Sequence, residues 1–222
     1  MSAYSDDAWE GMARSTDSQV ENLLLEEWLP AAPEVKRKLE EGAAVADVGC
    51  GRGAVLIKLA EAFPNSRYVG YDAFEPMIAR ATATAAAAEV ADRVSFRHLD
   101  ASKGLAEQYD VIMTFDVVHD AVDPRGLLRA IRQALRPGGS YLMLENNCSD
   151  KIQDNAGPVA TRRYGQSILY CLPTSLAGGG AGLGSDGLPE SKVRELCAEA
   201  GFGSVRLPWK SAFSVLYEIQ AR

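Results

Sequence analysis

A glycine-rich turn between an apolar run and a helical pattern carries most of the chemical information in this chain. Within residues 45–54, glycines stand at 49, 51 and 53, where the backbone can turn sharply and a ligand can approach without meeting a Cβ. Nineteen residues after Gly53, Asp72 ends a second apolar run. A carboxylate there can accept hydrogen bonds from both ribose hydroxyls of a nucleoside. The pattern therefore predicts a site for a nucleoside-containing cofactor.

Two classes of cofactor fit this turn. Gly49, Gly51 and Ala54 satisfy the loose G-x-G-x-x-G/A pattern of dinucleotide sites. S-adenosylmethionine, which has no phosphate, is favoured by Asp47, two residues before the first glycine, where a carboxylate suits the ammonium of an amino-acid tail. The third glycine at 53 and the short helix and two strands predicted at the end of the chain favour it as well.

A second candidate site follows another apolar run, at residues 115–124. His119 is one of only two histidines, and an unperturbed imidazole, with a pKa of ~6.5, takes up a proton near neutral pH. In an open α/β sheet the carboxyl ends of the strands line the ligand crevice. His119 is thus a candidate general base, with packing or cofactor contact as the open alternative, whereas His98 is expected to be structural.

Strands and helices alternate through the middle of the chain, which predicts a parallel α/β sheet covered on both faces. Strands are predicted over residues 43–48, 67–71, 94–97, 109–115 and 140–145, and helices over 54–63, 75–89 and 124–135. A helix from residue 17, broken by Pro30 and Pro33, and a second over 34–41 predict an N-terminal helical cap, 1–41, before a domain over 42–222.

The rhythm changes after Asn146. A helix is predicted over about 159–170, and residues 177–187 are glycine-rich, typical of a flexible loop or a lid. Residues 147–190 are therefore predicted to form an insertion that covers the substrate. A helix over 189–200 and strands over 204–207 and 212–219 close the chain as an antiparallel edge.

Composition narrows the classes of protein and partner. The 222 residues are 47% hydrophobic and 24% charged, which is ordinary for one soluble globular domain. The net charge of −7 disfavours a nucleic-acid partner, and the absence of a long apolar run or a leader predicts a cytoplasmic protein without membrane contact. The four cysteines stand far apart, so neither a metal site nor a disulfide is expected.

Three motifs in order resemble the class I S-adenosylmethionine-dependent methyltransferases. They are residues 47–53, residues 70–72 and residues 135–139, and the likeness is strong over about 43–146. The resemblance implies a three-layer α/β sandwich with a seven-stranded, mostly parallel Rossmann-like sheet whose last strand is antiparallel. It also implies S-adenosylmethionine as the cofactor.

The resemblance assigns the cofactor contacts by position. Asp100 and Ala101 match the place that meets the adenine amino group, although Leu99 stands where the family often has glycine. The other implied cofactor residues are Asp47, Gly49, Gly51, Gly53, Phe115 and Asp116 for the methionine half, Asp72 for the ribose, and Ala73 and Phe74 for the adenine.

His119-Asp120 is similar to the His-Asp pair of small-molecule O-methyltransferases, in which the histidine acts as a base; Ala121 departs from the tryptophan that usually follows. Methyl transfer is an in-line displacement at a sulfonium carbon, so the acceptor must be freed of its proton and held in line. Glu145, Asn146 and Tyr164 are the candidate substrate residues, with a structural polar role as the open alternative for each.

From Tyr4 onward the chain also resembles the catalytic part of bacterial methyltransferases that carry an N-terminal winged-helix domain, which is not expected in this sequence. Monomer and homodimer therefore both stay open. The predicted function is methyl transfer to a small molecule, with oxygen slightly preferred as the acceptor. The alternatives are an N- or C-methyltransferase and a non-catalytic or regulatory module that binds S-adenosylmethionine.

Overall fold

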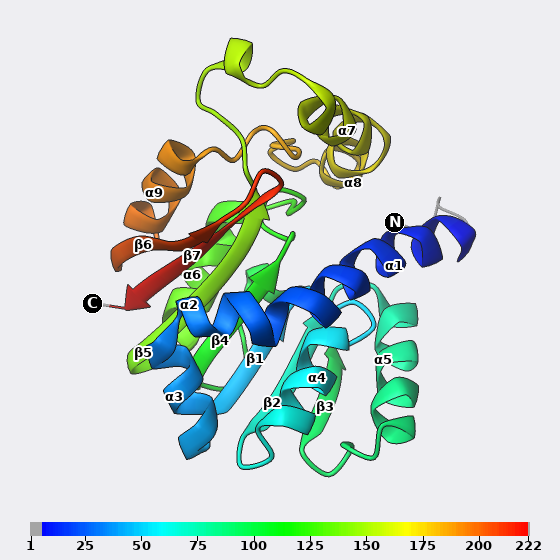
Figure 1. Ribbon diagram of the computed structural model, residues 1–222, viewed down its shortest axis with the longest axis vertical. Coiled ribbons are helices and arrows are strands. Elements are labelled where there is room, and N and C mark those ends of the chain that lie inside the picture. Colours follow the sequence, from blue (N-terminus) through cyan, green and yellow to red (C-terminus); the bar gives the residue numbers. More distant parts are fainter. Residues whose placement is uncertain (1–5, 222) are drawn as a thin grey trace.

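A seven-stranded sheet lies at the centre of the computed structural model, which describes residues 6–221 (Figure 1). The strand order is β3-β2-β1-β4-β5-β7-β6. Strands β1 to β5 run parallel, and β7 is antiparallel to both of its neighbours. The strands are β1 Ala44–Val48, β2 Arg67–Asp72, β3 Val94–His98, β4 Tyr109–Phe115, β5 Leu135–Asn146, β6 Phe202–Lys210 and β7 Ser214–Ala221. The predicted seven-stranded, mostly parallel sheet with an antiparallel last strand is confirmed.

Helices cover both faces of the sheet, which explains why β1 and β4 are apolar and buried along nearly their whole length. One face packs against α1, α3 and α4, the other against α6 and α9. The helices of the core are α1 Asp6–Leu23, α3 Pro33–Glu41, α4 Ala54–Ala62, α5 Glu75–Ala87, α6 Pro124–Ala134 and α9 Glu190–Glu199. The three layers of the predicted sandwich follow from this arrangement.

The leading helices share the core of the sheet. Trp28, in the π turn η1 Leu24–Trp28, is 1% exposed and stacks on Phe115 of β4 with ring centroids 5.5 Å apart. The short helix α2 Leu29–Ala31 leads into α3, which buries Val35 and Leu39 in the same cluster. Helix α1 begins at Asp6, earlier than predicted. Residues 1–5 of the predicted cap and residue 222 lie outside the described part, and the division into cap and domain stays a prediction.

The insertion after β5 contains one long helical stretch rather than the predicted short helix. Helix α7 Pro158–Gln166 continues through the π turn η4 Ser167–Cys171 into α8 Leu172–Ala177. Pro173 does not end this stretch; it follows directly after the π turn, whose last hydrogen bond runs from Leu172 N–H to the Ser167 carbonyl. Figure 1 shows α7 and α8 beyond the carboxyl ends of the strands.

No helix among residues 6–221 is both long enough and apolar enough to cross a bilayer.

Candidate active site

A cavity of about 1590 Å³ lies at the carboxyl ends of the parallel strands. It is walled by residues that follow β1, β2, β3, β4 and β5, by one side of α1 and by the helical stretch of the insertion. Ligand cavities usually enclose roughly 300–1,000 Å³, so this one has room for a nucleoside cofactor and a second molecule. The sheet thus brings the two candidate sites of the sequence to one place.

The glycine turn after β1 is tied to the end of β2. The backbone N–H groups of Gly49 and Cys50 donate to the Tyr71 carbonyl at 2.7 and 3.0 Å, and Gly51 N–H donates to Asp72 Oδ2 at 2.9 Å. Gly51 has a positive φ of 51°, and a Cβ built on it would meet no atom within 4 Å. The turn therefore leaves a backbone surface open to the cavity, as a cofactor cradle requires.

Gly53 is needed for packing, as is Gly49, where a Cβ would lie 2.5 Å from Val117 Cγ2. Gly53 does not line the cavity, and a Cβ on it would lie 2.5 Å from Phe96 Cζ at a φ of 81°. Glycine is required there so that α4 can begin close to β3. The contact of Gly53 with the methionine half of the cofactor stays a prediction.

Two carboxyl groups, the buried Asp47 and the partly buried Asp72, share the wall beside the turn. Burial, with the charge of Asp72 close by, raises the pKa of Asp47 well above its ordinary value. Burial also raises the pKa of Asp72, against hydrogen bonds from Phe74 N–H and Gly51 N–H that favour its charged form. Two such acids in one wall favour a cationic ligand, since a positive charge would offset the cost of ionising them.

The remaining predicted cofactor residues all line the same cavity. Asp100 is held by Ser102 through its N–H at 3.2 Å and its hydroxyl at 2.7 Å. Asp116 stands at the end of β4 with a positive φ of 56°. Burial, opposed by His119 but reinforced by Glu145 and Asp120, raises the pKa of Asp116 to about 7. The others on the wall are Ala73, Phe74, Ala101 and Phe115.

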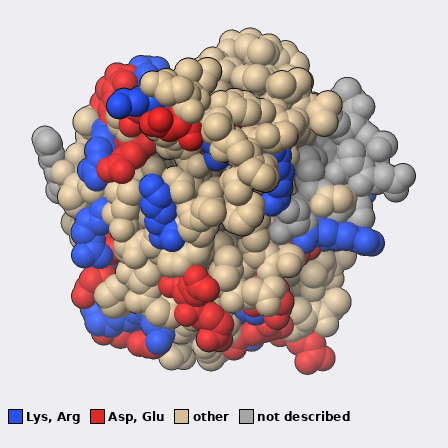
Figure 2. Space-filling view, turned by 45° about the horizontal axis from the view of Figure 1, so that its top comes forward, with Lys and Arg blue, Asp and Glu red and all other residues tan. Residues whose placement is uncertain are grey.

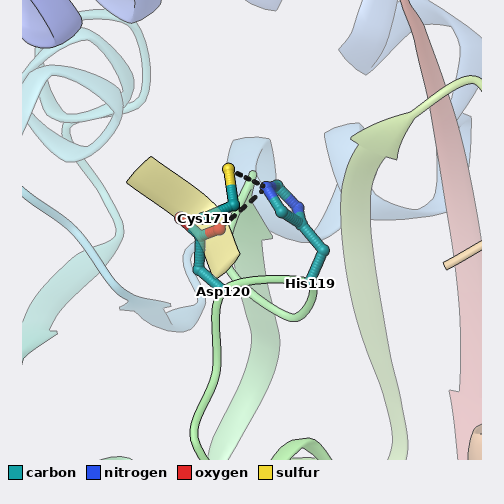
Figure 3. A group of neighbouring side chains, drawn as sticks. All are labelled: His119, Asp120 and Cys171. Atoms are coloured by element: carbon teal, nitrogen blue, oxygen red, sulfur yellow. Dashed lines mark hydrogen bonds and ion pairs between the residues drawn. The ribbon is translucent and has the colours of Figure 1, made fainter. Parts of the chain in front are cut away.

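His119 is oriented by a buried carboxylate. Its Nδ1 lies 2.5 Å from Glu145 Oε2, while Glu145 Oε1 accepts from Val118 N–H at 2.8 Å. On the other side of the ring, Nε2 lies 3.1 Å from Asp120 Oδ1 and 3.5 Å from Cys171 Sγ (Figure 3). Burial alone would lower the pKa of His119, but the carboxylates of Glu145 and Asp120 outweigh it and hold the pKa well above the ordinary value.

The predicted substrate residues divide in the structure. Asn146 lines the cavity, but Glu145 is fully buried behind His119 and Tyr164 is not on the wall. Glu145 therefore positions His119 rather than touching a ligand. In place of Tyr164, four side chains spaced four residues apart on the same helical stretch line the cavity, and the sequence did not predict them. They are Arg162, Gln166, Tyr170 and Thr174.

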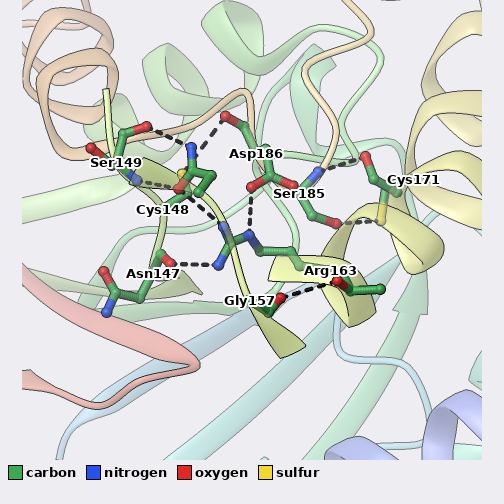
Figure 4. A network of polar contacts seen from close by, with 11 residues as sticks. Asn147, Cys148, Ser149, Gly157, Arg163, Cys171, Ser185 and Asp186 are labelled. Atoms are coloured by element: carbon green, nitrogen blue, oxygen red, sulfur yellow. Dashed lines mark hydrogen bonds and ion pairs between the residues drawn. The ribbon is translucent and has the colours of Figure 1, made fainter. Parts of the chain in front are cut away.

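Arg163 ties the insertion together (Figure 4). Its Nε donates to Asp186 Oδ1 at 2.6 Å, and its two terminal nitrogens donate to the Asn147 carbonyl at 2.7 Å and to Asn155 Oδ1 at 3.1 Å. One side chain thus connects α7 with the segment after β5 and with the glycine-rich segment.

The glycine-rich segment itself is hydrogen-bonded to the site. Gly184 N–H donates to the His119 carbonyl at 3.2 Å, Ala181 N–H to the Val122 carbonyl at 3.2 Å, and Ser185 N–H to Ser167 Oγ at 3.1 Å. Ser185 is buried. The segment is a packed wall behind His119, which composition alone did not indicate.

The comparisons with known proteins agree with this architecture. The family described as "Methyltransferase domain" matches residues 46–141. The O-methyltransferase xanE of Aspergillus fumigatus is 29% identical over 158 residues, 70% of this chain and 35% of that protein. The tRNA 5-carboxymethoxyuridine methyltransferase of Escherichia coli is 32% identical over 114 residues, 50% of this chain and 43% of that protein. The chain thus spans less than half of these curated relatives.

Solved structures share the fold. An O-methyltransferase family protein from Burkholderia thailandensis has a TM-score of 0.67 at 20% identity, covering 97% of this chain and 57% of that one. The SAH-bound methyltransferase CalO1 of calicheamicin biosynthesis also has a TM-score of 0.67 at 20% identity, covering 96% of this chain and 56% of that one. Residues 46–141 therefore match the methyltransferase-domain family, and the sheet with its helices has the fold of these solved methyltransferase structures.

Proposed function

We propose that this chain methylates a hydroxyl group of a small molecule, with S-adenosylmethionine as the methyl donor. The observation that carries the proposal is His119 on the wall of the cavity that also holds the glycine turn, with Glu145 paired to it from behind the wall. The relatives described as O-methyltransferases support an oxygen acceptor.

The residues around the glycine turn fit the cofactor. Gly51 leaves open space for a ligand. The buried Asp47 and the partly buried Asp72 favour a cationic ligand, and S-adenosylmethionine carries two cationic groups, an ammonium and a sulfonium. The cofactor residues in this proposal are Asp47, Gly49, Gly51, Asp72, Ala73, Phe74, Asp100, Ala101, Phe115 and Asp116. When bound, S-adenosylmethionine supplies an electrophilic methyl group.

The protein's part in the reaction is to hold the acceptor and take its proton. Glu145 accepts from Nδ1–H of His119, which fixes the tautomer and leaves Nε2 to accept the proton of the hydroxyl. The raised pKa makes His119 a stronger base than free imidazole, but it must first lose its own proton. The insertion, residues 147–190, encloses the acceptor and excludes water.

The distribution of charge on the surface favours a small-molecule acceptor over a nucleic acid. Basic and acidic side chains are interspersed over the face shown in Figure 2 and do not gather into one basic field. A non-catalytic module that only binds S-adenosylmethionine is the second candidate, because Nε2 of His119 faces Asp120 and Cys171 and the side chain is almost fully buried.

The test has two stages. S-adenosylmethionine or its demethylated product should raise the melting temperature, because both bind the folded state, whereas NAD and NADP should not. Incubation with methyl-labelled cofactor and a panel of phenols, carboxylates and amines should then label a phenol. Labelling of an amine alone would replace oxygen by nitrogen as the acceptor, and binding without any labelling would favour the non-catalytic module.

A further inference from the structure

Three side chains with different donor atoms converge beside the acceptor end of the cavity. They are His119, Asp120 and Cys171, and their donor atoms all lie within 4.8 Å of one another (Figure 3). His119 and Asp120 follow β4, while Cys171 ends the π turn of the insertion 52 residues from His119. All three line the cavity, so a small ion can reach them.

The spacing of the donor atoms suits a tetrahedral ion. Zinc bonds of ~2.0–2.3 Å to nitrogen, oxygen and sulfur place two ligand atoms on one ion about 3.3–3.6 Å apart. The structure has 3.1 Å between Nε2 and Asp120 Oδ1 and 3.5 Å between Nε2 and Cys171 Sγ. The third pair of donor atoms, on Asp120 and Cys171, lies within 4.8 Å, so these two side chains would have to move together to meet one ion.

The groups behind these three side chains are those of a metal site. Metal-bound histidines commonly donate their other ring N–H to a carboxylate, and Glu145 receives Nδ1 of His119 at 2.5 Å. Ser185 Oγ lies 3.2 Å from Cys171 Sγ, where a hydroxyl can stabilise a thiolate. Asp120 Oδ1 is buried and, within the described part of the chain, accepts no well-aligned hydrogen bond. It lies 3.1 Å from Nε2 of His119.

The types of donor atom also select the ion. A thiolate and an imidazole select soft or borderline ions over Mg²⁺ and Ca²⁺. We infer that His119, Asp120 and Cys171 form a binding site for a thiophilic divalent cation of the Zn²⁺ class.

The site has a consequence for catalysis that rests on the proposed function. The cation would occupy the nitrogen that takes the acceptor's proton, so it would inhibit methylation reversibly until a chelator removed it. The binding itself does not depend on that proposal and can be measured without an acceptor.

Co²⁺ added to chelator-treated, reduced protein is a direct probe. One equivalent should produce the near-ultraviolet sulfur-to-cobalt absorption and the visible bands of a tetrahedral ion, and Zn²⁺ should abolish both. Cys148→Ser is the matched control, since Cys148 is the more exposed thiol and contacts the Asp186 carbonyl instead. The spectrum should persist in Cys148→Ser and disappear in Cys171→Ala. In Asp120→Asn, the affinity for Co²⁺ should fall at least tenfold.

The two histidines provide an internal control by NMR of histidine-labelled protein. One equivalent of Zn²⁺ should shift the Nε2 signal of His119 and leave that of His98, which contacts the Ala73 carbonyl, in place. An unmoved His119 signal, or a cobalt–sulfur band that persists in Cys171→Ala, would overturn the site. A rise in the melting temperature of Cys171→Ala on addition of S-adenosylmethionine would show that the variant is folded. Because this response does not need the metal site, the metal proposal and the proposed function can fail independently.

Discussion

Substitution of His119 should distinguish catalysis from cofactor binding. In His119→Gln, the affinity for S-adenosylmethionine should stay nearly unchanged, because the glycine turn and Asp72 are untouched. The rate with a neutral hydroxyl acceptor should fall by about 10²–10⁴, the usual contribution of a positioned base. Isothermal titration for the cofactor and initial rates for the acceptor measure the two effects.

An acceptor that is already ionised, such as a carboxylate, controls for damage to the site. It needs no base, so it should be much less sensitive to His119→Gln, whereas a misfolded variant would fail with both acceptors. Full turnover of the neutral hydroxyl by the variant would show that His119 is not the base.

The charge of Glu145 should set the pH at which this base works. Only neutral imidazole accepts a proton. The pKa of His119 is raised above the ordinary value of 6.5 because the carboxylates of Glu145 and Asp120 outweigh the effect of burial. The rate with a neutral hydroxyl should therefore rise with pH and level off only above pH 6.5. In Glu145→Gln the pKa of His119 should fall and the plateau should begin at lower pH. An unchanged pH–rate profile would contradict the pairing.

Asp72 should determine the binding of the ribose. Asp72→Ala removes hydrogen bonds to a charged group and also frees Gly51 N–H, so binding of S-adenosylmethionine should weaken by about 1.5–3 kcal/mol. Titration calorimetry measures the loss. Asp100→Ala is a comparison on the same wall, where the carboxylate is more exposed and engaged with Ser102 and Lys103. Equal affinity for S-adenosylmethionine in the wild type and in Asp72→Ala would show that Asp72 does not bind the cofactor.

Elements with a simple pattern of apolar residues can be predicted from the sequence. Roles that depend on contacts between residues far apart in the chain cannot. Strand β1 with its glycine turn, and β2 with Asp72, follow from apolar runs and glycine spacing alone. The parallel sheet then brings their ends together, because carboxyl ends of parallel strands meet at one edge. The role of Glu145 does not follow in this way. It depends on a contact with His119, 26 residues away, that only folding creates.

The insertion was the least predictable element for the same reason. Its glycine content indicates a loop, but the hydrogen bonds to His119 and Val122 and the ion pair of Asp186 with Arg163 come from other parts of the chain. The π turn at Ser167–Cys171 has no distinct sequence signature, yet it carries Cys171 to His119.

Arg163 should hold the insertion closed. Its side chain and that of Asp186 are mostly buried, and breaking a buried pair by removing one partner costs about 3–5 kcal/mol. In Arg163→Ala, limited proteolysis within residues 178–187 should therefore become faster. Arg125→Ala is the control, since its pair with Glu199 is about half exposed and worth at most about 1 kcal/mol. Equal cleavage rates in both variants would mean that Arg163 does not hold the segment.

The elements form one cavity whose walls come from distant parts of the chain. The sheet supplies the floor, the insertion walls the side that carries His119, and α1 walls the side that carries the glycine turn. Ion pairs between Asp17 and Arg52 and between Glu21 and Lys58 at 2.9 Å join α1 to the glycine turn and α4. The leading helix is therefore part of the site although it is distant in sequence from every motif.

Cofactor binding should consequently stabilise α1 as well as the glycine turn. Residues 16–20 and Leu23 line the cavity, so S-adenosylmethionine would gain contacts there only while the helix is formed. Hydrogen exchange of the α1 amides should slow on addition of cofactor, because opening the helix would then also cost those contacts. Amides of α9, which packs on the far face of the sheet, should change less and serve as the reference. Protection confined to the glycine turn and β2, with α1 exchanging as before, would show that the leading helix is a neighbour of the cofactor site and not one of its walls.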